Sequence, residues 1–120
     1  MAESNPEELF NLGMLSYDKQ DFSKARKYFE RACGLNNGGG CSNLGVLYQN
    51  GQGVEKDLIK AAYFYSKACE LKEGDGCGAL GALYYNGDGV KQDSKKAAAL
   101  FEKACKLGYK KACEMLKELR

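Results

Sequence analysis

The 120-residue sequence contains no histidine and no tryptophan, and it has a single proline. Without histidine, neither a serine–histidine catalytic triad nor the usual histidine-containing zinc site can be built. No apolar run approaches the length of about 18 residues that a membrane-spanning helix requires. These absences exclude several common kinds of active site, and they predict a protein without a membrane partner.

The sequence also lacks a block of charge of one sign. Its 18 basic and 16 acidic residues are interspersed and give a formal net charge of +2. Proteins that bind nucleic acid through its phosphates normally gather basic residues on one segment or face, so we expect no nucleic-acid partner. No basic leader with an apolar core and a cleavage site precedes the first predicted helix, so we expect no signal peptide within this chain. The length predicts one domain, residues 1–120, and we expect a monomer.

What the sequence does contain is six cysteines in three evenly spaced pairs. Seven residues separate the two members of each pair, and each pair follows the previous one by 36 positions. The pairs are Cys33 with Cys41, Cys69 with Cys77, and Cys105 with Cys113. Spacing of this regularity indicates an internal structural repeat.

The cysteines could bind zinc, remain reduced or form disulfides. Paired zinc ligands usually stand about two to four residues apart and often include histidine, so a gap of seven argues against a metal. Joining cysteines of neighbouring pairs would leave the first and last cysteines unpaired at opposite ends of a stack of repeats. Joining each pair across its own short gap satisfies all six. We therefore predict three disulfides in that pattern, which implies a secreted or periplasmic protein.

The two full repeats, residues 41–76 and 77–112, are identical at 17 of 36 positions. An apolar stripe at helical spacing in residues 44–48 recurs 36 residues later and predicts the first helix of each repeat. A glycine-rich loop at residues 51–54 follows, and Asp57 then stands where a helix N-cap belongs. The alanine-rich segment after this aspartate predicts the second helix of a helical hairpin.

The first repeat is shorter, and its turn, around residues 18–21, lacks the glycine loop. Asn5 and Pro6 together are typical of a helix start. A last helix at residues 109–119 is expected to cap the stack. The repeats are expected at about residues 5–36, 37–72 and 73–108. We predict an all-α, right-handed α/α solenoid of three helical hairpins plus this C-terminal capping helix, stapled by disulfides.

The sequence resembles the Sel1-like repeat, a tetratricopeptide-like repeat lengthened by a glycine loop. The resemblance rests on the stripe at 44–48 (LGVLY), the loop at 51–54 (GQGV) and the helix motif at 60–62 (KAA). With its cysteine pairs, the chain is identified over residues 7–117 as a member of the Helicobacter cysteine-rich protein family, either natural or truncated, chimeric or engineered. The resemblance implies an interaction module that binds a protein or an extended peptide in a concave groove lined by the first helix of each hairpin.

The groove is predicted from the first-helix positions that the apolar stripe leaves free. These positions are Met14, Tyr17, Asp18, Ser42, Asn43, Val46, Gln49, Asn50, Asp75, Gly78, Ala82, Tyr85 and Asn86. They are polar and nearly neutral and include tyrosines, which suits recognition of a peptide main chain. The candidate peptide-binding residues among them are Tyr17, Asn43, Val46, Gln49, Asn50, Tyr85 and Asn86. Alternatively, Asn43 could tether adjacent repeats, and Asn50 and Asn86 could take left-handed conformations at helix ends.

An enzymatic function is an alternative, because some relatives in the cysteine-rich family have been described as penicillin-binding or β-lactam-hydrolysing proteins. Ser16 and Lys19 form one Ser-x-x-Lys pattern, as in penicillin-binding enzymes, but no SDN or KTG element accompanies them. Ser16 is expected near the end of a solvent-facing helix, with Lys19 as a solvated charge. We predict no catalytic residue, no cofactor and no metal. A third interpretation is an engineered scaffold without a natural ligand.

Overall fold

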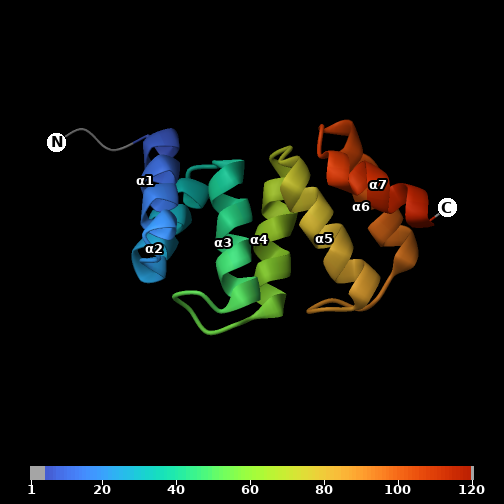
Figure 1. Cartoon of the computed structure of the whole chain (residues 1–120), viewed down its shortest axis with the longest axis horizontal. Helices are drawn as coiled ribbons and strands as arrows, with labels where there is room; N and C mark the ends of the chain where they lie inside the picture. The colour runs from blue at the N-terminus through green and yellow to red at the C-terminus, as the bar shows by residue number, and fades with distance from the viewer. Residues whose placement is uncertain (1–4, 120) are drawn as a thin grey trace.

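The structure is a computed structural model that describes residues 5–119, and in that part of the chain it contains seven helices and no strand. The helices are α1 (Pro6–Asp18), α2 (Phe22–Gly34), α3 (Gly38–Asn50), α4 (Leu58–Glu70), α5 (Gly74–Asn86), α6 (Ser94–Lys106) and α7 (Lys110–Leu119). Figure 1 shows them following one another along the long axis of an elongated molecule that measures 52 × 28 × 21 Å.

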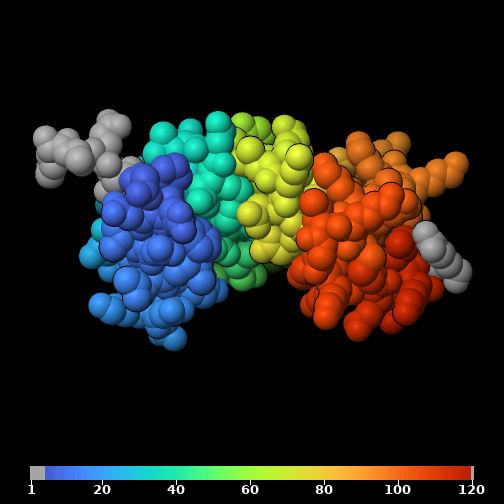
Figure 2. Space-filling model, turned by 90° about the horizontal axis from the view of Figure 1, so that it is seen from above, coloured from blue at the N-terminus to red at the C-terminus, as the bar shows by residue number. Residues whose placement is uncertain are grey.

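The helices pair into three hairpins, the first formed by α1 and α2, the second by α3 and α4, and the third by α5 and α6. The two helices of a hairpin pack most extensively against each other, and the second helix of each hairpin packs on the helix that follows it. The space-filling view shows the hairpins as successive blocks from blue to red (Figure 2). The predicted all-α solenoid of three hairpins plus a capping helix is confirmed.

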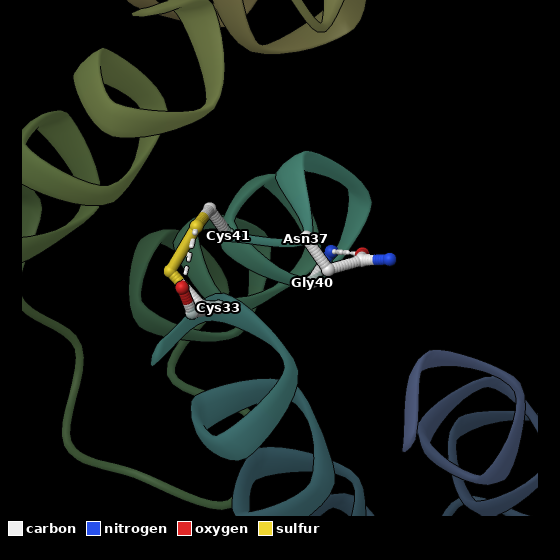
Figure 3. Close-up of a disulfide and its surroundings, with 4 residues drawn as sticks. All are labelled: Cys33, Asn37, Gly40 and Cys41. Atoms are coloured by element: carbon white, nitrogen blue, oxygen red, sulfur yellow. Dashed lines mark hydrogen bonds between the residues drawn. A yellow bond between two sulfur atoms is a disulfide. The ribbon is translucent and has the colours of Figure 1, made fainter. Parts of the chain in front are cut away.

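Side-chain caps explain where most of these helices begin. In five helices the N-cap side chain accepts a hydrogen bond, of 2.7–3.2 Å, from the backbone N–H three residues later. Each such bond satisfies one of the N–H groups that a helix start leaves unpaired. The five N-caps are Asn5, Asp21, Asn37, Asp57 and Asp93. Figure 3 shows the bond from the Gly40 N–H to the Asn37 side chain.

The core of every hairpin repeats one contact, an aromatic ring of the second helix lying on a glycine of the first helix. A Cβ atom added to any of the three glycines would stand 2.5–2.8 Å from a ring carbon, so only glycine lets the helices approach this closely. The three rings are at most 1% exposed. The pairs are Phe29 on Gly13, Tyr65 on Gly45, and Phe101 on Gly81.

The disulfides join neighbouring hairpins rather than the two helices of one hairpin. They link α2 to α3, α4 to α5, and α6 to α7, with Cα–Cα distances of 4.5–4.8 Å. Figure 3 shows the first of them, between Cys33 and Cys41. The predicted pairing across each short gap is confirmed for all six cysteines.

The glycine loops of the second and third hairpins, residues 51–57 and 87–93, lie along the same edge of the molecule (Figure 1). Gly53, with a φ of +72°, lies so close to the start of α2 that an added Cβ would stand 2.6 Å from the Phe22 carbonyl carbon. Gly89 contacts Leu58 at the start of α4 in the same way. Each loop therefore packs on the second helix of the hairpin before it.

Candidate functional site

The candidate site is the face formed by the exposed sides of α1, α3 and α5, which we call the inner face. Helix α3 contacts both α1 and α5, whereas the second helices of the hairpins contact one another less. In a curved stack of hairpins the layer with the closer spacing lies on the inside of the curve. The first helices are therefore taken as the candidate binding layer.

The glycines beneath the aromatic rings fix the register between the hairpins, and this register aligns two rows of predicted site residues. Tyr17, Gln49 and Tyr85 occupy one repeat position, and Asp18, Asn50 and Asn86 occupy the next. Both rows lie at the C-terminal ends of their helices, which in α3 and α5 lead into the glycine loops. Tyr85 is 45% exposed, and Asn50 and Asn86 are exposed.

The structure brings Tyr17 and Asn50 together through Gln52, a loop residue that the sequence analysis missed. The Tyr17 hydroxyl donates to the Gln52 Oε1 atom at 3.3 Å, and the Asn50 Nδ2 atom donates to the same oxygen at 3.4 Å. The Tyr17 ring also packs edge-on against Phe22, with ring centroids 5.2 Å apart. The only sequence signal for Gln52 was its place between two loop glycines. These contacts fix the end of α1 against the second hairpin.

Asn43 connects two neighbouring first helices. Its Nδ2 atom donates to the Met14 Sδ atom at 3.2 Å, and its side chain is half-buried between α3 and α1. This contact favours the alternative in which Asn43 tethers adjacent repeats, with a side-chain sulfur rather than a backbone group as its partner.

Gln49 is held in place by a buried tyrosine of the neighbouring helix. The Tyr65 hydroxyl donates to the Gln49 Oε1 atom. Burial raises the pKa of Tyr65 well above its ordinary value, and the nearby Asp75 carboxylate adds to the effect. Val46, also half-buried, packs on the core cluster that contains Tyr65 and Leu83. Gln49 and Val46 therefore offer a ligand only part of their side chains.

Four details of the predicted groove are corrected. Ser42 is only 3% exposed, and Gly78 is buried beneath the ring of Tyr109, so neither lies on the surface of the inner face. Asn50 and Asn86 are the last helical residues of α3 and α5, and the left-handed conformations belong to the glycines that follow them. The left-handed alternative for these two asparagines is therefore wrong.

The inner face also carries a pair of carboxylates, one of which the sequence analysis missed. Glu73 stands at the start of α5, and its side chain lies over Gly38. Partial burial raises the pKa of Glu73, and the charge of Asp75 raises it further. Asp18 adds a further carboxylate at the end of α1, and helices α1, α3 and α5 contain no basic side chain. The inner face is therefore acidic rather than nearly neutral.

The Ser-x-x-Lys pattern does not form an exposed nucleophile. Ser16 lies near the C-terminal end of α1, as expected, but its side chain is only 6% exposed. Its hydroxyl donates to the carbonyl oxygen of Leu12, one turn earlier, at 2.9 Å. Ser16 and Lys19 both line one small hollow, of about 150 Å³. A serine hydroxyl bonded back to its own helix is typical of a structural role.

Residues 5–119 contain no group of three or more histidine, cysteine, aspartate or glutamate side chains placed to hold a metal ion. All six cysteines are in disulfides. Within the same stretch, none of the helices combines the length and the apolar character needed to cross a bilayer.

Two repeat families match the chain. The Sel1 repeat matches residues 39–73 and 74–109, and the tetratricopeptide repeat matches residues 6–38. The boundary between the two matches falls at the first residues of α3.

Three known proteins illustrate the similarity. HcpC of Helicobacter pylori strain J99, a protein assigned by name to the β-lactamases, is 60% identical over 58 residues, which are 48% of this chain and 20% of HcpC. The match thus spans about a fifth of that relative's length. The structure of Helicobacter pylori cysteine-rich protein B has a TM-score of 0.75 and 52% identity, covering 78% of this chain and 70% of that one. A Sel1 repeat protein from Oxalobacter formigenes has a TM-score of 0.87 and 30% identity, covering 93% and 47%.

Proposed function

The chain belongs to the Sel1 repeat family and to the Helicobacter cysteine-rich proteins within it, and from that premise we propose that its inner face binds an extended segment of a partner protein. Sel1 and tetratricopeptide repeats are in general protein–protein interaction modules.

The observation that supports this proposal is the pair of side-chain rows along the three hairpins. An extended peptide presents an unpaired N–H or C=O group at every residue. Asn50 and Asn86 are exposed, and each amide can both donate and accept a hydrogen bond. Tyr85, which is also exposed, offers a flat surface and a hydroxyl beside them. Because these groups recur at a fixed repeat position, they match the repeating main chain of an extended peptide.

The charge of the inner face indicates the composition of the partner. Glu73, Asp75 and Asp18 place three carboxylates along the face, and Glu73 is partly withdrawn from water. A segment with lysine or arginine side chains at matching positions would pair with them, and such exposed pairs weaken as salt is added. We therefore expect a basic extended segment, bound more tightly at low ionic strength.

The disulfides support a setting for this function. Three disulfides in a chain of this size are typical of secreted and periplasmic proteins. We propose that the module works in such a compartment and as a monomer. No observation on Ser16 favours β-lactam hydrolysis as a second function, because its hydroxyl is covered and bonded to its own helix.

A random 12-residue peptide library displayed on phage, selected against the disulfide-bonded protein, tests the proposal. We expect the enriched peptides to carry lysine or arginine and to bind about tenfold more weakly to Tyr85→Ala and to Asn86→Ala, as expected when a central contact is lost. Tyr63→Ala is a matched control, since Tyr63 is an exposed tyrosine, 64% accessible, on the second helix α4.

Two results would contradict the proposal. One is selected peptides whose affinity depends on Tyr63 and not on Tyr85, which would place the interaction on the second helices. The other is the absence of any enriched family of peptides after repeated rounds of selection.

A further inference from the structure

The end of the stack formed by α1 and α2 exposes leucines that the rest of the solenoid buries. Leu12 is 38% exposed and Leu15 is 56% exposed. At the same two repeat positions, the second and third hairpins have leucines that are at most 7% exposed. These leucines are Leu44 and Leu47 in α3, and Leu80 and Leu83 in α5. The positions are therefore built for burial, and only the first hairpin leaves them open.

The second hairpin shows what normally covers these positions. Leu44 and Leu47 share a core cluster with Ala25 and Phe29 of α2, the second helix of the hairpin before them. Within residues 5–119 no helix stands in that place beside α1, and Figure 1 shows α1 and α2 at one end of the stack. A helix is therefore the element whose shape fits this end of the molecule.

A change at one repeat position opens a hollow on the same end. The second and third hairpins have Tyr48 and Tyr84 where the first hairpin has Ser16. The Tyr48 ring stacks on Phe64, with ring centroids 5.6 Å apart. In the first hairpin Tyr28 occupies the position of Phe64, and the smaller serine leaves a hollow of about 150 Å³ between Tyr28 and the two exposed leucines.

Basic side chains lie beside these apolar groups, along α2 and at the C-terminal end of α1, whereas the first turn of α1 carries the exposed Glu8. A second hollow, of about 600 Å³, adjoins the first along α2 and shares Asp21, Lys24 and Tyr28 with it. The two hollows together are lined by four basic side chains and one acidic side chain. The basic residues are Lys19, Lys24, Lys27 and Arg31. The one acid of the two hollows is Asp21, the N-cap of α2, and the four basic side chains outnumber it, so this rim is positively charged.

We propose that this end face, defined by Leu12, Leu15, Ser16 and Tyr28 with its basic rim, binds an acidic amphipathic helix of a partner protein. The apolar stripe of that helix covers Leu12 and Leu15, and one leucine or aromatic side chain fills the hollow beside Ser16. Glutamate or aspartate side chains flanking the stripe pair with the basic rim. This surface lies at the end of the stack and is separate from the inner face.

The charge distribution favours such a partner over a second copy of this chain. Two end faces packed on each other would bring the basic rims together. Packing the end face on the other end of a second copy would bring it to α7, which carries three lysines and two glutamates. Neither arrangement supplies the acidic flanks that the rim calls for.

Two synthetic peptides test this inference. The first is an 18-residue capped helical peptide with leucines at positions i, i+3, i+4 and i+7 and glutamates beside them, and the second is its twin with lysines in place of the glutamates. Fluorescence anisotropy with the disulfide-bonded protein measures binding of each. We expect saturable binding of the glutamate peptide, at least about tenfold tighter than that of the lysine twin.

Variants of the protein locate the binding site. Leu15→Glu places a negative charge at an exposed position and should weaken binding of the negatively charged glutamate peptide by about tenfold or more. Ser16→Tyr fills the hollow with the tyrosine that the other two hairpins have at this position, and it should weaken binding of the glutamate peptide as well. Ile59→Glu is the matched control, because Ile59 is a 72%-exposed apolar residue on α4, and it should change binding by less than about twofold.

Three outcomes would overturn the inference. The first is no saturable binding of the glutamate peptide up to about 1 mM. The second is that Ile59→Glu weakens binding of this peptide as much as Leu15→Glu does. The third is a dimer, seen by sedimentation, that Leu15→Glu dissociates, because a second copy of the chain would then occupy the end face. The melting temperature of each variant checks that it folds. If Ser16→Tyr does not fold, the result for Leu15→Glu tests the proposal by itself. Peptides selected on the inner face should still bind Leu15→Glu, so the two proposals fail separately.

Discussion

The first hairpin and the two that follow it share one core contact but connect their helices differently. All three hairpins place a second-helix ring on a first-helix glycine. The first hairpin joins its helices through residues 19–21, with Gln20 at a φ of +63°. The second and third hairpins use the longer segments 51–57 and 87–93, which begin with left-handed glycines.

The difference shows that the glycine loop is a contact between hairpins as much as a turn within one. Gly53 of the second hairpin lies against Phe22 of the first, and Gly89 of the third hairpin lies against Leu58 of the second. The first hairpin has a short turn instead of this loop, and residues 5–119 include no hairpin before α1 on which such a loop could pack.

Substituting the loop glycine should have the largest effect on this comparison. Gly53→Ala would place a methyl group 2.6 Å from the Phe22 carbonyl carbon at a φ of +72°. Backbone strain and the clash together should lower the free energy of unfolding by about 3 kcal/mol or more. Urea denaturation followed by circular dichroism measures this loss.

Gly108→Ala is the control for this substitution. Gly108 has a φ of +95° but no atom within 4 Å of an added Cβ, so only strain of about 1 kcal/mol should appear. Equal losses in the two variants would mean that the loop acts as a turn alone.

Removing disulfides should have the next largest effect. Each bridge closes a loop of the same length, and the chain-entropy estimate for such a loop is about 2.5 kcal/mol. Cys33 and Cys41 are 3% and 0% exposed and belong to the core cluster shared by the first two hairpins. Replacing both with alanine should therefore cost about 3 kcal/mol, because packing is lost as well.

The bridge of the capping helix provides the comparison. Cys105 and Cys113 are half-buried and tie only α7 to α6. Their double alanine variant should lose less stability, and thiol titration during mild reduction should find this bridge opened before the first one. A larger loss in this variant than in the first would show that α7 supports the whole stack rather than its end alone.

Substituting Tyr65 should change the free energy of unfolding least at neutral pH and should have a distinct effect at alkaline pH. The other two hairpins have phenylalanine at this position, so only the second hairpin has an ionisable ring in its core. Tyr65→Phe removes the hydrogen bond to Gln49 and should cost about 1 kcal/mol near pH 7.

At alkaline pH the effect of Tyr65→Phe on stability should change. An unfolded tyrosine ionises near pH 10, as expected from its ordinary pKa of about 10, whereas burial raises the pKa of Tyr65 in the folded protein. The folded state thus keeps a proton that the unfolded chain releases, so this residue's contribution to stability is constant below about pH 10 and falls as the pH rises above it. Unfolding at pH 9, 10 and 11 should show a shallower decline in Tyr65→Phe. Parallel declines in the two proteins would mean that Tyr65 ionises freely in the folded state.

The regular features of the fold were predictable because they depend on neighbours within one repeat. Helix stripes, the aspartate N-caps and the loop glycines recur in register, and each reflects a local backbone requirement. The disulfide pairing followed from the same register. Ser16 lies near the end of its helix as expected, but the low exposure of its side chain depends on how α1 packs, which the sequence pattern does not show.

The inner face was only partly predictable, because its contacts join residues of different hairpins. The repeat position of Asn50 and Tyr85 could be read from the sequence, but the bonds from Tyr17 to Gln52 and from Asn43 to Met14 cross from one hairpin to the next. Glu73 was missed for a similar reason, since its place over Gly38 depends on the packing of the third hairpin on the second.

The sequence by itself therefore determined the number of hairpins, the register of their core contacts and the pairing of the cysteines, since all of these are set by periodicity and local geometry. Only the tertiary structure decided which side chains the stack covers and which it leaves open. Leu15 and Leu47 occupy the same repeat position, yet one is 56% exposed and the other is buried. The physical reason is that burial depends on whether a neighbouring hairpin packs against that face, which no single repeat encodes.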